Sequence, residues 1–258
     1  MTLVINFMLT WYKKYQIMNI NWKYPPKNLT INPTEIHVWK THLEQSDIDL
    51  KESFDILNEE EKIKAQRFRF EKHQQRFTIA RSSLRRILSL YLWISHQKID
   101  FQYNAYGKPQ LLDNINKINL QFNVSHSENI AIYGITCHNL IGVDIEYMRP
   151  MAEAENLAKR FFSQKEFEQI SKLPSAEQDR EFFQLWTGKE AYLKAIGKGI
   201  SGGLEKVEIS PHEPRKFIRL PESNPNNYNL VYLTPENNYL AAIAVENKQQ
   251  NYQYWQLN

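Results

Sequence analysis

The stretch FFQLWTGKEAYLKAIGKGISGG, residues 182–203, joins an apolar helical segment to a glycine-rich end. Apolar side chains recur at helical spacing in its first part, which predicts a helix packed into the core. Gly197 is expected to end this helix, because glycine readily adopts the backbone conformation found just past helix termini. One face of the predicted helix carries Phe183, Thr187, Glu190, Ala191 and Lys194.

Two interpretations of Glu190 and Lys194 are open. On a solvated surface they would form an i,i+4 ion pair, which stabilises a helix by only about 0.2–0.5 kcal/mol. Their neighbours are aromatic and aliphatic, however, including Trp186 and Leu193. A carboxylate and an ammonium in apolar surroundings need a partner, and they often carry a function.

The glycines also match G-x-G-x-x-G, in GKGISG at residues 197–202. A dinucleotide-binding fingerprint must follow a strand and open a helix. This one follows a helix, so we exclude that interpretation.

The segment LIGVDIEYM, residues 140–148, reads as a strand. Alternation places Gly142, Asp144 and Glu146 on one face, with the two carboxylates roughly 6–7 Å apart. The face is either an ordinary half-exposed one or a site for a divalent cation, because hard cations bind carboxylate oxygens.

Upstream, FNVSHSENIAIYG reads as strand, turn and strand, with Ser125 and His126 where the first strand ends. These two residues either cap the turn or contact a phosphate group, for which a hydroxyl and an imidazole are suitable donors. The nearby YNAYGKPQLL contains a turn at residues 107–109.

Residues 62–86 hold nine basic side chains, and Glu71 is the only acidic one among them. The basic residues are Lys62, Lys64, Arg67, Arg69, Lys72, Arg76, Arg81, Arg85 and Arg86. The segment is either a solvated helix surface or a surface that binds phosphate or nucleic acid. Interleaved phenylalanines would allow base stacking in the second case.

The 258 residues suffice for one large domain or two small ones, and the net charge of +3 favours an anionic partner. A single cysteine, Cys137, excludes an intramolecular disulfide and suits a reducing compartment. We expect a cytoplasmic protein with no membrane segment. Residues 1–17 carry their lysines after the apolar run, unlike a signal peptide, and are interpreted as a mis-called start or an extension.

The element order predicts an α+β fold. A strand at EIHVWKTHL is followed by helices over residues 55–94, expected to be two, then by strands, further helices and short strands. Regular βαβ alternation is absent, which argues against a doubly wound sheet. We expect an extension and lead-in at 1–35, an N-terminal half at 36–148 and a C-terminal half at 149–258.

Five segments in this order resemble one family. GKP, FNVSHS, GVDIE, RFFSQKEFEQI and FFQLWTGKEAYLKAIGKGI are similar to the motifs of 4'-phosphopantetheinyl transferases. The type resembled is the longer, monomeric one, which activates nonribosomal peptide, polyketide and fatty-acid synthases. The resemblance implies two similar α+β halves related by a pseudo-twofold axis, with the active site in the cleft between them.

The resemblance also implies roles for residues of this chain. Asp144, Glu146 and Glu190 match the magnesium ligands. Lys64, Arg76, Lys108, Pro109, Ser125, His126 and Lys194 match contacts to coenzyme A. Glu190 and Lys194 match the catalytic pair, in which the carboxylate acts as ligand and as base, directly or through water. Lys64 and Arg76 fall in the least regular of these motifs.

The implied reaction moves the 4'-phosphopantetheine group of coenzyme A to a serine of an acidic apo carrier protein and releases 3',5'-ADP. The implied partners include neither nucleic acid nor a membrane. Two alternatives remain: another magnesium-dependent phosphotransferase, which would consume ATP, or an RNA-binding module built on residues 62–86. The second alternative leaves the carboxylates unexplained.

Overall fold

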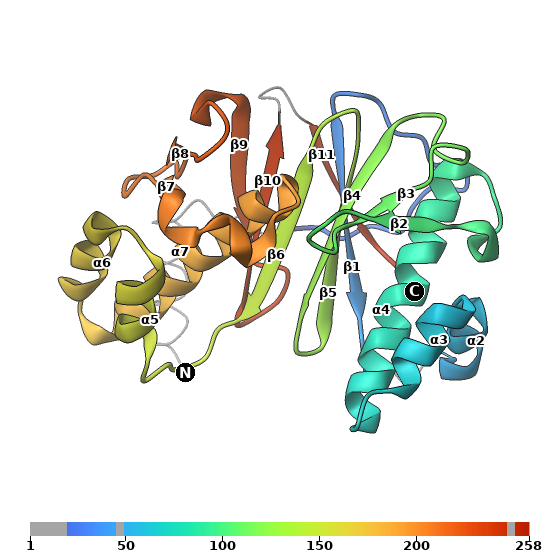
Figure 1. Cartoon of the computed structure of the whole chain (residues 1–258), viewed down its shortest axis with the longest axis horizontal. Helices are drawn as coiled ribbons and strands as arrows, with labels where there is room; N and C mark the ends of the chain where they lie inside the picture. The colour runs from blue at the N-terminus through green and yellow to red at the C-terminus, as the bar shows by residue number, and fades with distance from the viewer. Residues whose placement is uncertain (1–19, 45–48, 247–250, 258) are drawn as a thin grey trace. The chain divides into compact units, whose positions relative to one another are not determined.

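The computed structural model describes residues 20–44, 49–246 and 251–257. It is a mixed α+β structure, as predicted, and its contacts divide it into two compact units (Figure 1). The possible extension at residues 1–17 lies outside the described residues. No helix in the described part of the chain is long and apolar enough to cross a bilayer. The pseudo-twofold axis and the cleft stay predictions.

The N-terminal unit spans Trp22–Ile141 and also takes in the strand at the end of the chain. Its elements are β1 (Glu35–His42), α2 (Leu50–Ile56), α3 (Glu59–Gln66), α4 (Glu71–Leu92), η1 (His96–Lys98), β2 (Phe101–Tyr103), β3 (Pro109–Leu111), β4 (Leu120–Ser127), β5 (Ile130–Cys137) and β11 (Asn251–Gln256). Among the described residues, one sheet runs in the order β11-β1-β5-β4 and β2 pairs with β3.

The core of this unit lies between α4 and the β11-β1-β5-β4 sheet. Ile79, Leu84 and Leu88 of α4 are buried in one cluster with Trp39 and Tyr133 of the sheet. The Tyr133 hydroxyl donates to the Ala80 carbonyl at 3.0 Å, which ties β5 to the helix. The prediction of two helices over residues 55–94 is confirmed by α3 and α4, and α2, which ends at Ile56, is a further helix before them.

Strand β11 pairs in parallel with β1, with Glu35 opposite Asn251 and Lys40 opposite Gln256. We predicted a C-terminal half at 149–258, whereas the structure groups this last strand with the N-terminal unit. Trp255 on β11 packs against the N-terminal core cluster. Burial of this large aromatic side chain is a physical reason for the strand to pair there.

The C-terminal unit lies within Gly142–Lys248. Its elements are β6 (Ile141–Tyr147), α5 (Ala154–Phe161), α6 (Gln164–Ser171), α7 (Ser175–Ala195), η2 (Gly199–Gly202), η3 (Leu204–Lys206), β7 (Glu208–Ile209), β8 (Phe217–Arg219), η4 (Pro225–Asn227), β9 (Tyr228–Leu233) and β10 (Tyr239–Glu246). Among the described residues, the larger sheet runs β6-β10-β9, and β7 pairs with β8.

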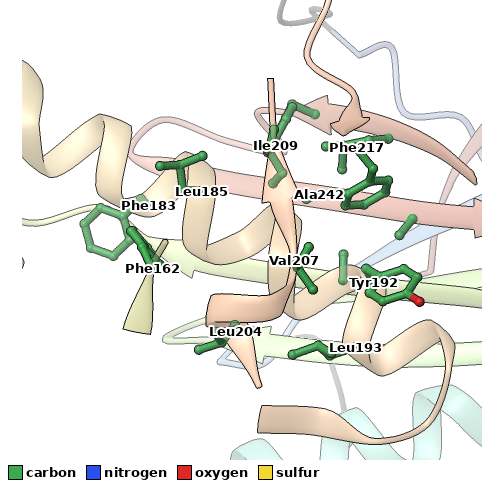
Figure 2. Packing of buried hydrophobic residues seen from close by; sticks show 14 of the residues in the cluster. Phe162, Phe183, Leu185, Tyr192, Leu193, Leu204, Val207, Ile209, Phe217 and Ala242 are labelled. Atoms are coloured by element: carbon green, nitrogen blue, oxygen red, sulfur yellow. The ribbon is translucent and has the colours of Figure 1, made fainter. Parts of the chain in front are cut away.

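Helix α7 is the centre of this second unit. Its Leu185, Tyr192 and Leu193 are buried in one cluster with Phe217 and Ala242 of the neighbouring strands (Figure 2). Helix α7 ends at Ala195, and Gly197 follows with φ of 75°, as the sequence predicts. The quoted stretch is therefore the element around which this unit is built.

Candidate active site

Strand β6 presents Asp144 and Glu146 on the face that meets α7. The contact at Gly142 shows how near the helix lies, since a Cβ added there would come within 2.0 Å of the Ala191 carbonyl oxygen. Asp144 is only 4% exposed. The interpretation of this face as half-exposed is therefore wrong for Asp144, because α7 covers it.

Helix α7 supplies Glu190 and Lys194 to the same place. Glu190 is 5% exposed, and the Lys194 Nζ donates to Asp144 Oδ1 at 2.5 Å. Lys194 thus binds a carboxylate on the neighbouring strand. The interpretation of Glu190 and Lys194 as a surface ion pair is wrong, because Glu190 is buried.

The electrostatics show that these groups act on one another. Burial is the largest cause of a rise in the pKa of Glu190 to about 7, and the negative charge of Asp144 contributes to this rise. Lys194 opposes this rise in the pKa of Glu190, and Glu146 adds to it. Like charges held close, together with burial, disfavour the ionised form of a carboxyl group such as that of Glu190. A bound cation would relieve the repulsion.

The chemistry of the carboxylates fits a magnesium ion. Among the described residues, none donates a hydrogen bond to Glu190 Oε1, although this oxygen is buried. A buried carboxylate oxygen needs a donor or a cation, and magnesium prefers oxygen ligands. The same part of the chain contains no group of three His, Cys, Asp or Glu side chains already arranged to hold a metal. The carboxylates that could bind magnesium are therefore present, but their oxygens do not yet surround a single point.

The residues predicted to contact coenzyme A lie in the N-terminal unit, apart from Lys194. Ser125 and His126 are consecutive on β4, where Ser125 is buried and His126 exposed. Lys108 follows the turn between β2 and β3, and its Nζ donates to the Ile141 carbonyl at 3.1 Å. Burial lowers the pKa of Lys108 to about 8. Pro109 begins β3.

Lys64 and Arg76 lie on different helices of that unit. Lys64 on α3 is exposed, with its Nζ 5.3 Å from the centre of the Phe77 ring. Arg76 on α4 donates to Glu44 at 2.8 Å and to Glu128 at 2.9 Å. A phosphate at Arg76 would have to share its guanidinium with these two carboxylates.

Most of the basic segment is engaged with carboxylates, which sequence spacing did not indicate. Carboxylate partners within 4.0 Å are found in the described residues for Lys62, Lys72, Arg76, Arg81, Arg85 and Arg86. Arg85 is fully buried and donates to Glu61 at 2.7 Å. A uniformly solvated or RNA-binding face is therefore wrong for this segment, because its charges are largely neutralised.

Comparisons with known proteins decide the family. The C-terminal residues 140–244 match the family model of the 4'-phosphopantetheinyl transferase superfamily. Residues 39–136 match the model of the 4'-phosphopantetheinyl transferase N-terminal domain. The chain is 41% identical over 226 residues to the 4'-phosphopantetheinyl transferase HetI of Nostoc sp. (strain PCC 7120), covering 87% of this chain and 93% of the relative.

This chain is a member of the 4'-phosphopantetheinyl transferase family. It is 38% identical to a putative 4'-phosphopantetheinyl transferase of Synechocystis sp. (strain PCC 6803), over 73% of this chain and 79% of the relative. It is 30% identical to the 4'-phosphopantetheinyl transferase Sfp of Bacillus subtilis (strain 168), over 73% of this chain and 82% of that protein. The resemblance inferred from the five motifs is confirmed.

The phosphopantetheinyl transferase is an enzyme that moves phosphopantetheine from coenzyme A to carrier proteins. The alternatives of an ATP-dependent phosphotransferase and of an RNA-binding module are therefore set aside. Its C-terminal unit also contains a buried pair that sequence reasoning did not assign, formed by Glu166 of α6 and Lys189 of α7. The capping pattern around Ser163 was a signal for α6, but nothing in the spacing indicates its distant partner.

Proposed function

We propose that this transferase binds magnesium through Asp144, Glu146 and Glu190 and uses Glu190 and Lys194 in the transfer step. The buried, hydrogen-bond-deficient Oε1 of Glu190 is the observation that carries the proposal. Asp144 on β6 and Lys194 on the same helix accompany it, and all of these residues belong to one unit. A magnesium ion bound there would neutralise negative charge on the pyrophosphate of coenzyme A.

Glu190 acts as the proton acceptor. The serine hydroxyl of the carrier protein attacks the β-phosphorus of coenzyme A, and its proton passes to Glu190, directly or through water. A carboxylate within hydrogen-bond reach of the serine hydroxyl, or linked to it by one water, can accept this proton. A bond forms between the serine oxygen and the β-phosphorus, the bond from that phosphorus to the oxygen bridging it to the α-phosphorus breaks, and the bridging oxygen leaves as part of 3',5'-ADP.

Lys194 stabilises the leaving group. Its ammonium is about a quarter exposed, so it can exchange Asp144 for a phosphate oxygen. Negative charge builds on the leaving oxygen in the transition state, and a cation positioned beside it lowers the barrier. Lys108, Pro109, Ser125 and His126 are proposed to hold the nucleotide part of coenzyme A, with Lys64 and Arg76 at its 3'-phosphate.

The proposed acceptors are acidic apo carrier proteins, which complement a chain of net charge +3. The test is incubation of the purified protein with coenzyme A, magnesium and several apo carrier proteins. Mass spectrometry should show one carrier gaining phosphopantetheine on serine, and neutral carriers should react more slowly. Equal rates for acidic and neutral carriers would contradict the electrostatic part of the proposal.

Asp144→Ala tests the carboxylate group itself. Transfer should fall by a factor on the order of 10² to 10³ or more, because the variant loses a charged ligand. The melting temperature should change little, since the variant also removes a repulsive neighbour of Glu190. A large drop in melting temperature, with activity kept in the folded fraction, would make Asp144 a structural residue.

A further inference from the structure

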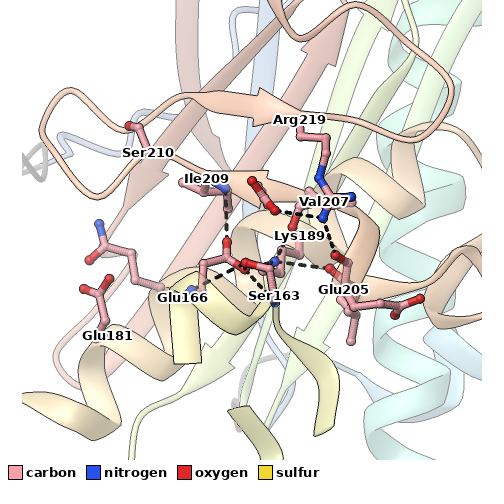
Figure 3. A network of polar contacts seen from close by, with 12 residues as sticks. Ser163, Glu166, Glu181, Lys189, Glu205, Val207, Ile209, Ser210 and Arg219 are labelled. Atoms are coloured by element: carbon pink, nitrogen blue, oxygen red, sulfur yellow. Dashed lines mark hydrogen bonds and ion pairs between the residues drawn. The ribbon is translucent and has the colours of Figure 1, made fainter. Parts of the chain in front are cut away.

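Lys189 is fully buried on α7, and its ammonium group is completely engaged. Its Nζ donates to Glu166 Oε2 at 2.7 Å, to the Leu204 carbonyl at 3.1 Å and to the Val207 carbonyl (Figure 3). A lysine ammonium has three donors, so this geometry uses all of them. Such a complete set of partners compensates a buried charge, which is otherwise costly.

Glu166 extends these contacts to strand β7 and to the N-cap of its own helix. Its Oε1 accepts from the Ile209 backbone N–H at 3.1 Å, and its Oε2 accepts from the Ser163 N–H at 3.1 Å (Figure 3). Glu166 lies on α6, Ile209 on β7, and Ser163 caps α6. This buried ion pair and its hydrogen bonds therefore connect α6, η3 and β7 to the second half of α7.

This ion pair holds α7 at the residue just before the active-site carboxylate. Lys189 and Glu190 are consecutive, and consecutive residues of an α-helix point about 100° apart. Glu190 is directed to the Asp144 side, where the β6 backbone meets α7 at Gly142. The helix is thus held by backbone contact on one side and by the Lys189–Glu166 pair on another.

We propose that Lys189 is a positioning residue of the transferase. By binding Glu166 and the carbonyls that follow the glycine-rich segment, it fixes the rotation of α7 and sets Glu190 against Asp144. The proposal rests on the proposed role of these two carboxylates in binding the metal. Lys189 itself touches neither substrate nor metal.

A purely stabilising ion pair is the competing explanation, and paired substitutions separate the two. Lys189→Met alone would leave Glu166 buried without its cation and is expected to destabilise the unit strongly. The double variant Lys189→Met with Glu166→Gln removes both charges and keeps the side-chain volumes similar. Replacement of both partners of a buried pair in this way is often neutral for stability.

The same helix provides a matched control. Glu181 of α7 binds Arg215 through two hydrogen bonds, at 2.9 and 2.7 Å, and both side chains are buried. This second ion pair lies more than two turns of helix before Glu190. Its double variant, Glu181→Gln with Arg215→Met, removes comparable charges and leaves the Lys189–Glu166 ion pair intact.

Four quantities are measured for both double variants: melting temperature, Mn²⁺ affinity by electron paramagnetic resonance without substrates, kcat, and KM for coenzyme A. The Lys189/Glu166 variant should stay folded, bind Mn²⁺ at least about tenfold more weakly and lose at least about tenfold in kcat, with KM within about twofold. The Glu181/Arg215 variant should keep Mn²⁺ affinity and kcat within about twofold.

Equal behaviour of the two double variants would overturn the proposal, and so would wild-type kcat in the Lys189/Glu166 variant. Unfolding of that variant would also overturn it, because the pair would then support the whole unit. Asp144→Ala, assayed alongside, keeps the two proposals distinguishable. An active Asp144→Ala refutes the metal assignment, whereas an inactive one beside a normal Lys189/Glu166 variant refutes only the positioning role.

Discussion

Lys194 has two possible partners in the proposed reaction, a carboxylate and a phosphate. Its ammonium lies 2.5 Å from Asp144 Oδ1, where a divalent cation would also bind. Two cations cannot share one small anionic site without repulsion. In the proposed site, Lys194 and a bound metal would therefore compete for Asp144 until a phosphate oxygen replaces the carboxylate as the partner of Lys194.

This competition predicts opposite effects of two substitutions on metal binding. Lys194→Ala should strengthen Mn²⁺ binding in the absence of coenzyme A, by roughly threefold to tenfold, because the competing ammonium is gone. Glu190→Gln should weaken it by about tenfold or more, since a charged ligand is lost at almost unchanged volume. Both variants should lose transfer activity. A titration in which both substitutions change the Mn²⁺ affinity in the same direction would contradict the competition.

His37 predicts an acid-sensitive step in stability. Its Nδ1 lies 2.8 Å from the Tyr91 hydroxyl, which accepts a hydrogen bond from Trp39 Nε1. Burial lowers the pKa of His37 from 6.5 to about 4, although Glu35 opposes this. The unfolded chain therefore binds a proton below pH 6.5 that the folded chain does not bind until about pH 4.

The free energy of unfolding should fall between pH 6.5 and 4, by about 3 kcal/mol in total from this residue. Above pH 6.5 the contribution is fully present. His37→Asn removes the titration while keeping a polar group of similar size. Urea unfolding at several pH values should show a smaller acid-induced loss in this variant, and an identical loss would contradict the assignment.

Residue patterns predicted which side chains share a face of a strand, but not which of them other elements cover. The alternation along β6 correctly placed Asp144 and Glu146 on one face. It could not show that Asp144 is buried, because the covering helix lies about fifty residues further along the chain. For the same reason the sequence gives no sign of the partner of Lys189, because Glu166 belongs to another element.

At the scale of elements, Gly142 sets the distance between β6 and α7. Gly142→Ala would bring a Cβ within 2.0 Å of the Ala191 carbonyl oxygen and 2.3 Å of the Ala195 nitrogen, both of them backbone atoms. The helix must move, at a cost of about 3 kcal/mol or more. We expect a lower melting temperature and loss of transfer in the fraction that still folds, since Glu190 moves with the helix.

Gly199→Ala is the control for this change. Gly199 has φ of 52°, and a Cβ there would meet no atom within 4 Å. Only backbone strain is expected, on the order of 1–2 kcal/mol. Near-wild-type transfer by Gly199→Ala beside an inactive Gly142→Ala would support contact between the elements as the cause. An equal loss of transfer activity in both variants would point instead to a general effect of replacing a glycine.

Element boundaries were predictable where glycine marked them and not elsewhere. The end of α7 before Gly197 is confirmed, since Gly197 adopts a positive φ. The break between α3 and α4 has neither glycine nor proline, and it leaves Phe70 as the N-cap without a side-chain hydrogen bond. The local sequence therefore carries no glycine or proline signal for the end of α3.

For the whole molecule we predict a monomer in solution. Both family models match within one chain, so a single chain carries both the N-terminal part and the transferase part. Sedimentation equilibrium should give the mass of one chain, independent of concentration in the micromolar range. An obligate trimer would contradict the expectation that the two halves of one chain form the site.

The parallel pairing of β11 with β1 makes the N-terminal unit depend on a strand that is synthesised after β6 to β10 of the other unit. On the ribosome, β1 can pair with β5 early, but its other edge stays open until β11 emerges. The C-terminal unit, whose β6 to β10 follow one another along the chain, is free to fold first. A nascent chain stalled after β10 should therefore expose the β11-facing edge of β1 to chaperones.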